Sequence, residues 1–368
     1  MENRNIVVLL RVPFLDKIPS LKTLIIYLSK RGYHITIVTS YDEMYPQFDF
    51  QLDNISICLV KQRSKTFEVP TSMKLMLKSI FIWCKKRPKF FIGGDCLANI
   101  LLFRLSKLLP IKYINFLLEY PDISSSKETK SLETASYIIT HDQWHRNFLQ
   151  EHYKIESNKF LFLPNASYTP MCYEKENYLY RELNIPMDKK IILHSGGLGK
   201  WFLCKELACS TGSWPDNFVL VFHTSHIVDS SPYYKEMIDN ISEKVHFSVR
   251  PVSNEVLDKL VASAYIGIAL YSVSELGYRA LYMGLAAGKI GNYLKCGIPV
   301  IASDLPSLSY IEDYKCGVLV ADVNQVGEAI LSIQEDYELY SKNARKCYQE
   351  LWNPDRYLAE IEKKIFRS

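Results

Sequence analysis

The sequence lacks any cysteine pattern that would hold a metal or build a disulfide framework. Its nine cysteines are widely scattered, and no two of them follow the C-x-x-C spacing. This argues against a zinc site and against a small disulfide-stapled fold. Reduced thiols in a cytosolic protein are the simpler interpretation.

Long apolar runs are also missing. The stretch YIGIALYSV at 265–273 is roughly half as long as the ~20 residues that cross a bilayer. The start, MENRNIVVLLRVPF, enters a strand pattern and has no small-residue cleavage site, so we expect no signal peptide. We predict a cytoplasmic protein.

What is present indicates a folded protein of two domains. The chain has 368 residues, with 48% hydrophobic and 23% charged side chains, which suits two cores of ordinary size. The 13% aromatic content, with 25 tyrosines, fits surfaces that stack on sugars or other rings, and it fits an aromatic-rich core equally well.

Positive charge gathers in the first half of the chain. Residues 61–112 contain 12 Lys and Arg against 2 Asp and Glu. The segment 71–88 can form a helix with Lys74, Lys78 and Lys85 on one side, typical of an interfacial helix on anionic lipid. A core helix with a solvated basic face is an equal alternative. Because no nucleic-acid motif accompanies the charge, we expect no nucleic-acid partner.

Strand and helix patterns alternate along the whole chain. In the first half we predict strands over 5–14, 33–40, 89–95, 112–120, 136–142 and 159–165, with helices between them. Residues 166–188 then lose periodicity and predict a linker. A second α/β series follows, with strands over 189–197, 218–225, 245–249, 265–272 and 317–320. Two doubly wound halves place a ligand in the cleft between them, at the carboxyl ends of the strands.

The stretch GKIGNYLKCGIPVIAS (288–303) resembles a segment of GT-B glycosyltransferases, most of all glycosyltransferase family 4, the "group 1" transferases. The residues that match are Lys289, Tyr293, Leu294, Gly297 and Pro299–Ser303. The likeness covers residues 160–350 well. It implies two Rossmann-like domains that face each other across a cleft: an acceptor domain over 1–168, a linker over 169–186, and a nucleotide-sugar domain over 187–349. Residues 350–368 are expected as a C-terminal helix that packs back on the first domain.

The same segment predicts an anion site on physical grounds. If a helix begins near Leu285, the free amides of Ala286, Ala287 and Gly288 can bind a diphosphate. Lys289 adds a point charge for the same oxygens. Asn292, one turn later, can reach a ribose hydroxyl. The alternative is a surface Lys and Asn on an ordinary helix.

Two departures from the family pattern concern donor binding. The family commonly has Glu where this chain has Asn292, and another Glu where it has Gly284. The neutral Asn still permits a hydroxyl contact, whereas Gly284 removes a group that often holds the donor sugar. Either the pocket is rearranged, with Glu275, Tyr278 or Arg279 as replacements, or the activity is altered or lost.

Further donor-side candidates lie in two loops. In HSGGLGK (194–200), Gly196 and Gly197 let the backbone pass close to a phosphate, and Lys200 can reach the leaving group. Because Trp201 follows this lysine and the P-loop spacing is absent, an ATPase is excluded. Arg250 lies where the family passes main chain along the nucleobase, and Ser303 follows the matching strand. We expect Asp304 or Ser307 to cap the next helix, and Glu312 to be an ordinary helix carboxylate.

Acceptor-side candidates in the first half are Asp16, Asp95 and His141. Each lies in a loop or at a strand end, although a structural role is the more common one for a lone carboxylate there. The resemblance implies a retaining reaction that needs no protein base, because the departing phosphate can take the acceptor proton.

These observations predict a glycosyltransferase that moves a sugar from a nucleotide-diphosphate donor to a glycan or lipid-linked glycan, in polysaccharide or surface-glycan synthesis. We expect no metal and no cofactor beyond the donor, and peripheral attachment to the inner face of the membrane through residues 71–88. Two alternatives remain: a sugar-nucleotide epimerase of the same fold, and a non-catalytic nucleotide-sugar-binding subunit.

Overall fold

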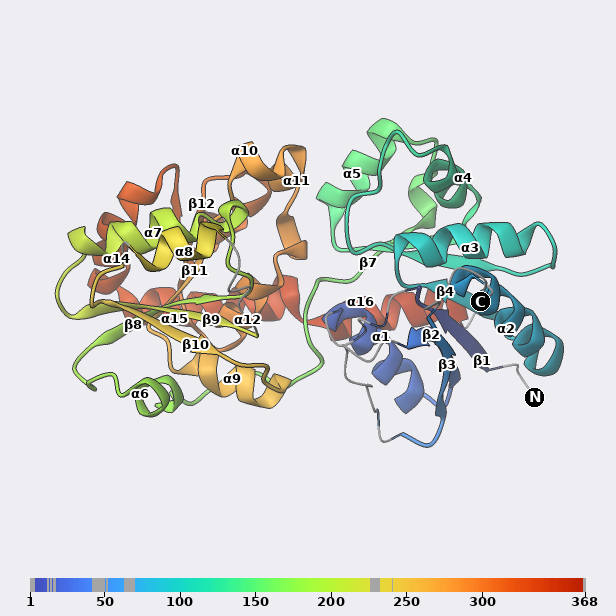
Figure 1. Ribbon diagram of the computed structural model, residues 1–368, viewed down its shortest axis with the longest axis horizontal. Coiled ribbons are helices and arrows are strands. Elements are labelled where there is room, and N and C mark those ends of the chain that lie inside the picture. The colour runs from blue at the N-terminus through green and yellow to red at the C-terminus, as the bar shows by residue number, and fades with distance from the viewer. Residues whose placement is uncertain are drawn as a thin grey trace. The chain divides into compact units, whose positions relative to one another are not determined.

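The computed structural model divides into two compact units (Figure 1). Unit 1 comprises residues 1–168 and 354–368, and unit 2 comprises residues 169–353. The structure describes residues 4–366, except residues 12, 14, 16, 17, 42–49, 51, 63–69, 226–231 and 240. Among these described residues, no helix is both long and apolar enough to cross a bilayer. All nine cysteines are free thiols.

Unit 1 is built on a sheet of seven parallel strands in the order β3-β2-β1-β4-β5-β6-β7. The strands are β1 (Asn5–Leu9), β2 (His34–Tyr41), β3 (Ile55–Lys61), β4 (Phe90–Gly93), β5 (Tyr113–Phe116), β6 (Tyr137–Thr140) and β7 (Phe160–Phe162). The helices are α1 (Pro19–Lys30), α2 (Thr71–Lys86), α3 (Cys96–Ser106), α4 (Ser126–Thr134), α5 (Gln143–His152), the short η2 (Ser157–Lys159), α16 (Pro354–Ile361) and η9 (Glu362–Phe366). The predicted alternation of strands and helices is confirmed, and β3 is a strand that the sequence analysis missed.

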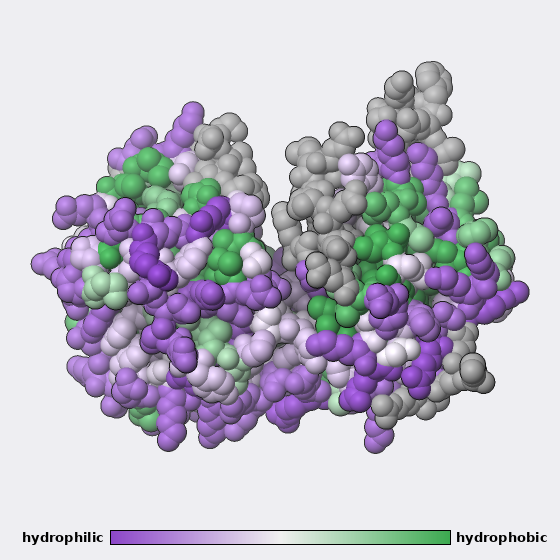
Figure 2. Space-filling model, turned by 90° about the horizontal axis from the view of Figure 1, so that it is seen from below, coloured by the Kyte–Doolittle hydropathy of each residue, from purple (hydrophilic) through white to green (hydrophobic). Residues whose placement is uncertain are grey.

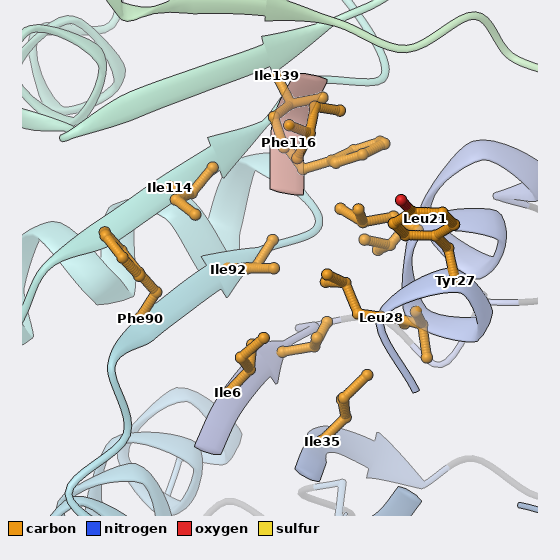
Figure 3. Packing of buried hydrophobic residues seen from close by; sticks show 14 of the residues in the cluster. Ile6, Leu21, Tyr27, Leu28, Ile35, Phe90, Ile92, Ile114, Phe116 and Ile139 are labelled. Carbon is orange, nitrogen blue, oxygen red and sulfur yellow. The ribbon is translucent and has the colours of Figure 1, made fainter. Parts of the chain in front are cut away.

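The strands in the core of unit 1 are continuous apolar runs because helices cover the sheet. Side chains from β1, β2, β4, β5 and β6 meet α1 on one face of the sheet, as Figure 3 shows for Ile6, Ile35, Ile92 and Leu28. Helices α2 and α3 lie against the same sheet. Parallel sheets are covered on both faces, so their strands have no polar side.

The end of the chain belongs to unit 1. Leu358, Ile361 and Phe366 join its core. The Tyr27 hydroxyl donates to Glu362 Oε2 at 3.0 Å. Helix α16 begins at Pro354, because a proline disfavours helical geometry at the residue before it and suits the first turn of a new helix.

Unit 2 repeats the design with six parallel strands in the order β10-β9-β8-β11-β12-β13. The strands are β8 (Lys190–Ser195), β9 (Phe218–Thr224), β10 (Val245–Val249), β11 (Ile266–Ala269), β12 (Val300–Ser303) and β13 (Gly317–Val320). Helices α7 (Cys204–Ser210), α8 (Pro232–Ile238) and α14 (Val326–Glu335) share one core with the sheet. Helix α12 (Gly288–Lys295) packs against β11, α9 (Asn254–Ala262) and α15 (Tyr337–Cys347).

The remaining elements of unit 2 are short. They are α6 (Tyr178–Leu183), η3 (Lys200–Phe202), η4 (Thr211–Ser213), α10 (Val273–Leu276), α11 (Tyr278–Leu281), η5 (Gly284–Ala286), η6 (Pro306–Leu308), α13 (Tyr310–Asp313), η7 (Val323–Gln325) and η8 (Tyr348–Trp352).

Residues 169–186, predicted as a linker, are bound to unit 2. They include α6, whose Leu179 is buried. The Cys172 amide donates to the Lys295 carbonyl at 3.3 Å, and the Lys295 ammonium reaches Thr169 Oγ1 at 2.6 Å. The segment is polar in sequence because backbone and side-chain hydrogen bonds, more than apolar contacts, hold it.

Candidate nucleotide-sugar site

The sheet of unit 2 has one point where its strand order reverses, between β8 and β11. From β8 the chain proceeds to β9 and β10 on one side, and from β11 to β12 and β13 on the other. In open α/β sheets ligands bind at the carboxyl ends of the strands beside such a point. The loops after Ser195 and Ala269 therefore define where a ligand site is expected.

Tyr293 of α12 ties the helix to this point. Its hydroxyl accepts from the Ser195 amide at 2.9 Å and donates to the Leu193 carbonyl at 2.9 Å. The ring lies directly on Gly267 of β11, where a Cβ would collide with it. Lys289 precedes Tyr293 by four residues, so it lies on the same face of the helix, one turn nearer the N-terminus.

The Gly196–Gly197 turn and Lys289 come together at the end of β8. Gly196 has φ +142°, in the range that favours glycine, and its amide donates to the His223 carbonyl at 2.9 Å. A Cβ on Gly196 would lie 3.4 Å from Lys289 Nζ. The structure thus brings the predicted glycine turn next to the predicted lysine at the start of α12.

The ammonium of Lys289 is buried, and no described residue supplies a counter-charge for it. Part of the side chain is exposed, but Nζ is inaccessible to water and has no hydrogen-bond partner in the described part of the chain. Nζ lies 3.7 Å from the ring centroid of Phe202 and 5.7 Å from that of Tyr271. Burial lowers the pKa of Lys289 to about 8, and the nearby Cys204 thiol opposes this shift.

His194 contacts the Gly196–Gly197 turn. Its Nε2 lies 3.1 Å from the Gly197 carbonyl, which requires the tautomer with the proton on Nε2. Burial, and then the Lys289 ammonium, hold the pKa of His194 well below its usual value, so the imidazole is neutral. The Lys289 ammonium thus contacts aromatic faces beside a glycine turn. An anionic ligand would supply the counter-charge that a buried cation requires.

The N-terminus of α12 differs from the prediction. The helix begins at Gly288 rather than near Leu285, because Gly284–Ala286 form a separate 3-10 turn. The amides of Ala286 and Ala287 donate to the carbonyls of Met283 and Gly284, so they are not available to a ligand.

The amides that the start of α12 does offer are those of Gly288 and Lys289. Neither has an acceptor among the described residues. Asn292 is half-buried and forms no hydrogen bond there either, so its amide can accept a ligand contact. The helix amides that could meet an anion therefore begin at Gly288, two residues later than predicted.

The other donor-side candidates are distributed differently. Lys200 is exposed on η3. Arg250 is bound through its guanidinium to Glu182 Oε2 at 2.8 Å and to the Tyr178 hydroxyl, and so fastens α6 to the end of β10. The Ser303 hydroxyl accepts from the Tyr271 amide at 2.8 Å and donates to its carbonyl, so it positions Tyr271.

Of three residues singled out after β12, two do not play the predicted role. Asp304 and Ser307 cap no helix, because neither η6 nor α13 has a side-chain cap. Ser307 Oγ instead accepts from the Gly284 amide at 3.1 Å and holds the turn before α12. Glu312 is an exposed residue of the first turn of α13, as expected.

In unit 1 the acceptor-side candidates are structural where they are described. Asp95 caps α3 by accepting from the Ala98 amide at 2.8 Å, and also accepts from the Arg11 amide at 2.6 Å. His141 is buried, and its two ring nitrogens face the carbonyls of Leu163 and Leu118. Burial lowers its pKa. Asp16 lies outside the described residues.

Part of the second half of the chain is similar to a known family. Residues 217–358 match the family of glucosyltransferase 3-like C-terminal domains. This range contains α12, Lys289 and Asn292, and the match bears out the predicted glycosyltransferase class for this part of the chain. No curated protein sequence matches the chain.

Solved structures with the same fold extend over both units. Sucrose-phosphate synthase from Thermosynechococcus elongatus is 16% identical, with a TM-score of 0.73 over 98% of each chain. Anabaena HepE, solved with UDP-glucose, is 12% identical, with a TM-score of 0.71 over 99% of this chain and 100% of its own. A glycosyltransferase from Rickettsia africae is 15% identical, with a TM-score of 0.71 over 99% and 100%. The predicted resemblance to GT-B proteins and the GT-B fold are confirmed.

Proposed function

We propose that this protein transfers a sugar from a nucleotide-diphosphate donor to a glycan or lipid-linked glycan acceptor. One observation carries the proposal. The buried Lys289 ammonium lies beside the Gly196–Gly197 turn, and neither it nor the amides of Gly288 and Lys289 have a partner in the part of the chain that the structure describes. These groups are suited to bind a diphosphate. The family match and HepE, a structure that binds UDP-glucose, support a sugar nucleotide as its source.

The chemistry follows from the charge that develops on the leaving group. When the bond from the sugar C1 to the diphosphate oxygen breaks, negative charge grows on that oxygen. An ammonium and two helix amides, fixed in place before the reaction, stabilise it. We propose that no metal and no cofactor other than the donor takes part, and that the new C1 bond forms to an acceptor hydroxyl with retention. The acceptor proton then passes to the departing phosphate.

Two residues support the alternatives of a binding subunit or an epimerase. Gly284 has φ +45° and its amide is bound to Ser307, so the turn is built around the missing side chain. Asn292 offers the ribose a neutral contact, which is weaker than the charge-assisted bond of a carboxylate. A catalytic protein must then hold the donor sugar with other groups.

A donor panel distinguishes these functions. The protein is incubated with UDP-, GDP- and ADP-sugars, with and without glycan acceptors, and products are separated by anion-exchange chromatography. Release of nucleoside diphosphate or transfer to an acceptor supports a transferase. An isomerised donor would make the protein an epimerase, and binding without turnover would make it a subunit. Lys342→Met, at an exposed position of α15 in the same unit, serves as the matched control for Lys289→Met.

We also propose that the protein attaches to the anionic inner face of the membrane through α2. Thr71, Leu75, Ser79 and Ile82 face the core of unit 1. Met73, Leu77 and Phe81 form a row one turn apart that is 53%, 54% and 60% exposed. Lys78 Nζ lies 5.8 Å from the ring centroid of Phe81, and Lys85 lies in the last turn of the helix. Hydrophobic and hydrophilic residues are intermixed on the face of the molecule that Figure 2 draws. An exposed apolar row with flanking lysines is the pattern of an interfacial helix.

A further inference from the structure

We propose that the exposed indole of Trp201 is a stacking surface for a sugar ring, either that of the donor or that of the acceptor. This inference rests on the proposed function and assigns a specificity-determining residue to the same site. Its basis is an exposed aromatic side chain whose ring centroid lies at most about 10 Å from the buried ammonium.

Trp201 is 46% exposed although it is the largest apolar side chain near the site. It follows Lys200 on η3, the turn that continues the Gly196–Gly197 loop. An exposed tryptophan beside a candidate ligand site offers a large aromatic face on which a ligand ring can stack. Helix α10, which packs against η3, carries a second exposed apolar side chain, Val273.

The indole is held rigidly. The Trp201 carbonyl accepts from the Ser272 amide at 3.0 Å, which ties η3 to the loop after β11. The ring lies on Gly199, where a Cβ would be 2.6 Å from Trp201 Cε2. Gly199 thus makes room for the ring, and the indole presents its other side outward. A rigid, two-sided aromatic gives binding at low entropic cost.

Trp201 lies near the buried ammonium. The centroid of Phe202 lies 3.7 Å from Lys289 Nζ and 6.2 Å from the centroid of Trp201, so the centroid of the indole lies at most about 10 Å from the ammonium. A sugar ring attached to a phosphate beside Lys289 can therefore reach the indole, and stacking contact requires a separation of about 4 Å.

The surroundings favour a sugar over a lipid or a protein. Lys200, Glu275 and Arg279 are exposed on the same elements and carry charges of both signs. Hydroxyl groups accept and donate to such side chains, whereas an anionic membrane favours a basic surface. An aromatic face bordered by mixed polar groups suits a carbohydrate, whose ring carries C–H bonds on its faces and hydroxyls at its edge.

Calorimetric titration of the full chain with UDP and with UDP-glucose tests this inference. If the donor sugar stacks, Trp201→Ala leaves UDP affinity within twofold of the unmodified protein and weakens UDP-glucose at least fivefold. Trp201→Phe restores most of the loss. Tyr173→Ala, at an aromatic residue of the same unit that is 66% exposed, is the control and changes neither.

An acceptor arm separates the second source of the sugar. With UDP bound, saturation-transfer NMR detects contact of a panel of methyl glycosides with the protein. If the acceptor stacks, Trp201→Ala abolishes this signal and leaves both titrations unchanged. Unchanged titrations together with an unchanged or absent glycoside signal would overturn the inference, as would an equal loss of UDP and UDP-glucose. An unmodified protein that binds no nucleotide would defeat the proposed function itself.

Discussion

Replacing Lys289 by methionine should make the protein more stable and its nucleotide site weaker. Methionine keeps the length of the side chain and removes the charge. The pKa of Lys289 is lowered from 10.5 to about 8 because Nζ is buried. A shift of this size corresponds to about 3 kcal/mol of folding free energy lost to the buried charge. The cation–π contact with Phe202 returns about 1 kcal/mol, so we expect a net gain of about 2 kcal/mol in the variant.

The effect of Lys289 on the free energy of unfolding depends on pH. The unfolded state has the higher pKa and binds more protons between pH 8 and about 10.5, so stability of the unmodified protein rises with pH across this window. Below pH 8 the full cost is present. Urea unfolding at pH 7 and pH 9.5 should therefore show a gain for Lys289→Met that shrinks at the higher pH. Lys200→Met, where the lysine is exposed, should show no such trend.

Nucleotide binding should move in the opposite direction. Loss of one charge-assisted contact costs about 1.5–3 kcal/mol, or roughly 10- to 150-fold in the dissociation constant for UDP. For the unmodified protein, affinity should fall as pH rises through about 8, because the empty site loses its proton. A variant that is less stable at pH 7 and binds UDP normally would refute the account of a buried, uncompensated ammonium.

Three further predictions concern Asn292 of α12, two lysines of α2 and Gly267 of β11. Asn292→Glu should bind the nucleotide as well or better, because a carboxylate accepts from both ribose hydroxyls; a drop in affinity and turnover at an unchanged thermal midpoint would defeat the ribose contact. Reversal of Lys78 and Lys85 to Glu should lower flotation with anionic vesicles at least tenfold, since each lysine contributes about 1 kcal/mol; unchanged flotation, or none by the unmodified protein, argues against the membrane role of α2. Gly267→Ala should destabilise the fold by about 1–3 kcal/mol and weaken UDP binding, because a Cβ at this position displaces the Tyr293 ring. The control variant Gly212→Ala should do neither, because no atom lies within 4 Å of the added Cβ. Equal behaviour of the two variants would contradict the role given to Tyr293.

The sequence predicts what depends on local pattern. Strands buried on both faces, such as β8 and β9, stand out as apolar runs between turns. Strand β3 was missed because it lies at the sheet edge, where all of its residues except Val60 are partly or fully exposed, so it forms no continuous apolar run. Helix α6 was missed because a single buried leucine and distant partners, among them Arg250, hold it in place.

In the candidate site, too, the sequence predicts the residues with a local pattern and misses those that distant segments bring together. The glycine turn and Lys289 could be found because they adjoin recognisable strands. Phe202 and Tyr271, which surround the ammonium, come from two other loops, so no local pattern joins them to it. The start of α12 was misplaced because Ser307, 23 residues beyond Gly284, fixes the turn before it.

A crystal structure of the protein with UDP bound tests the central claim most directly. The account predicts diphosphate oxygens within hydrogen-bond distance of Lys289 Nζ and of the Gly288 and Lys289 amides, beside the Gly196–Gly197 turn. It further predicts that the ribose lies next to Asn292. A nucleotide bound elsewhere on the chain, with Lys289 still resting on Phe202 and unpaired, would contradict it.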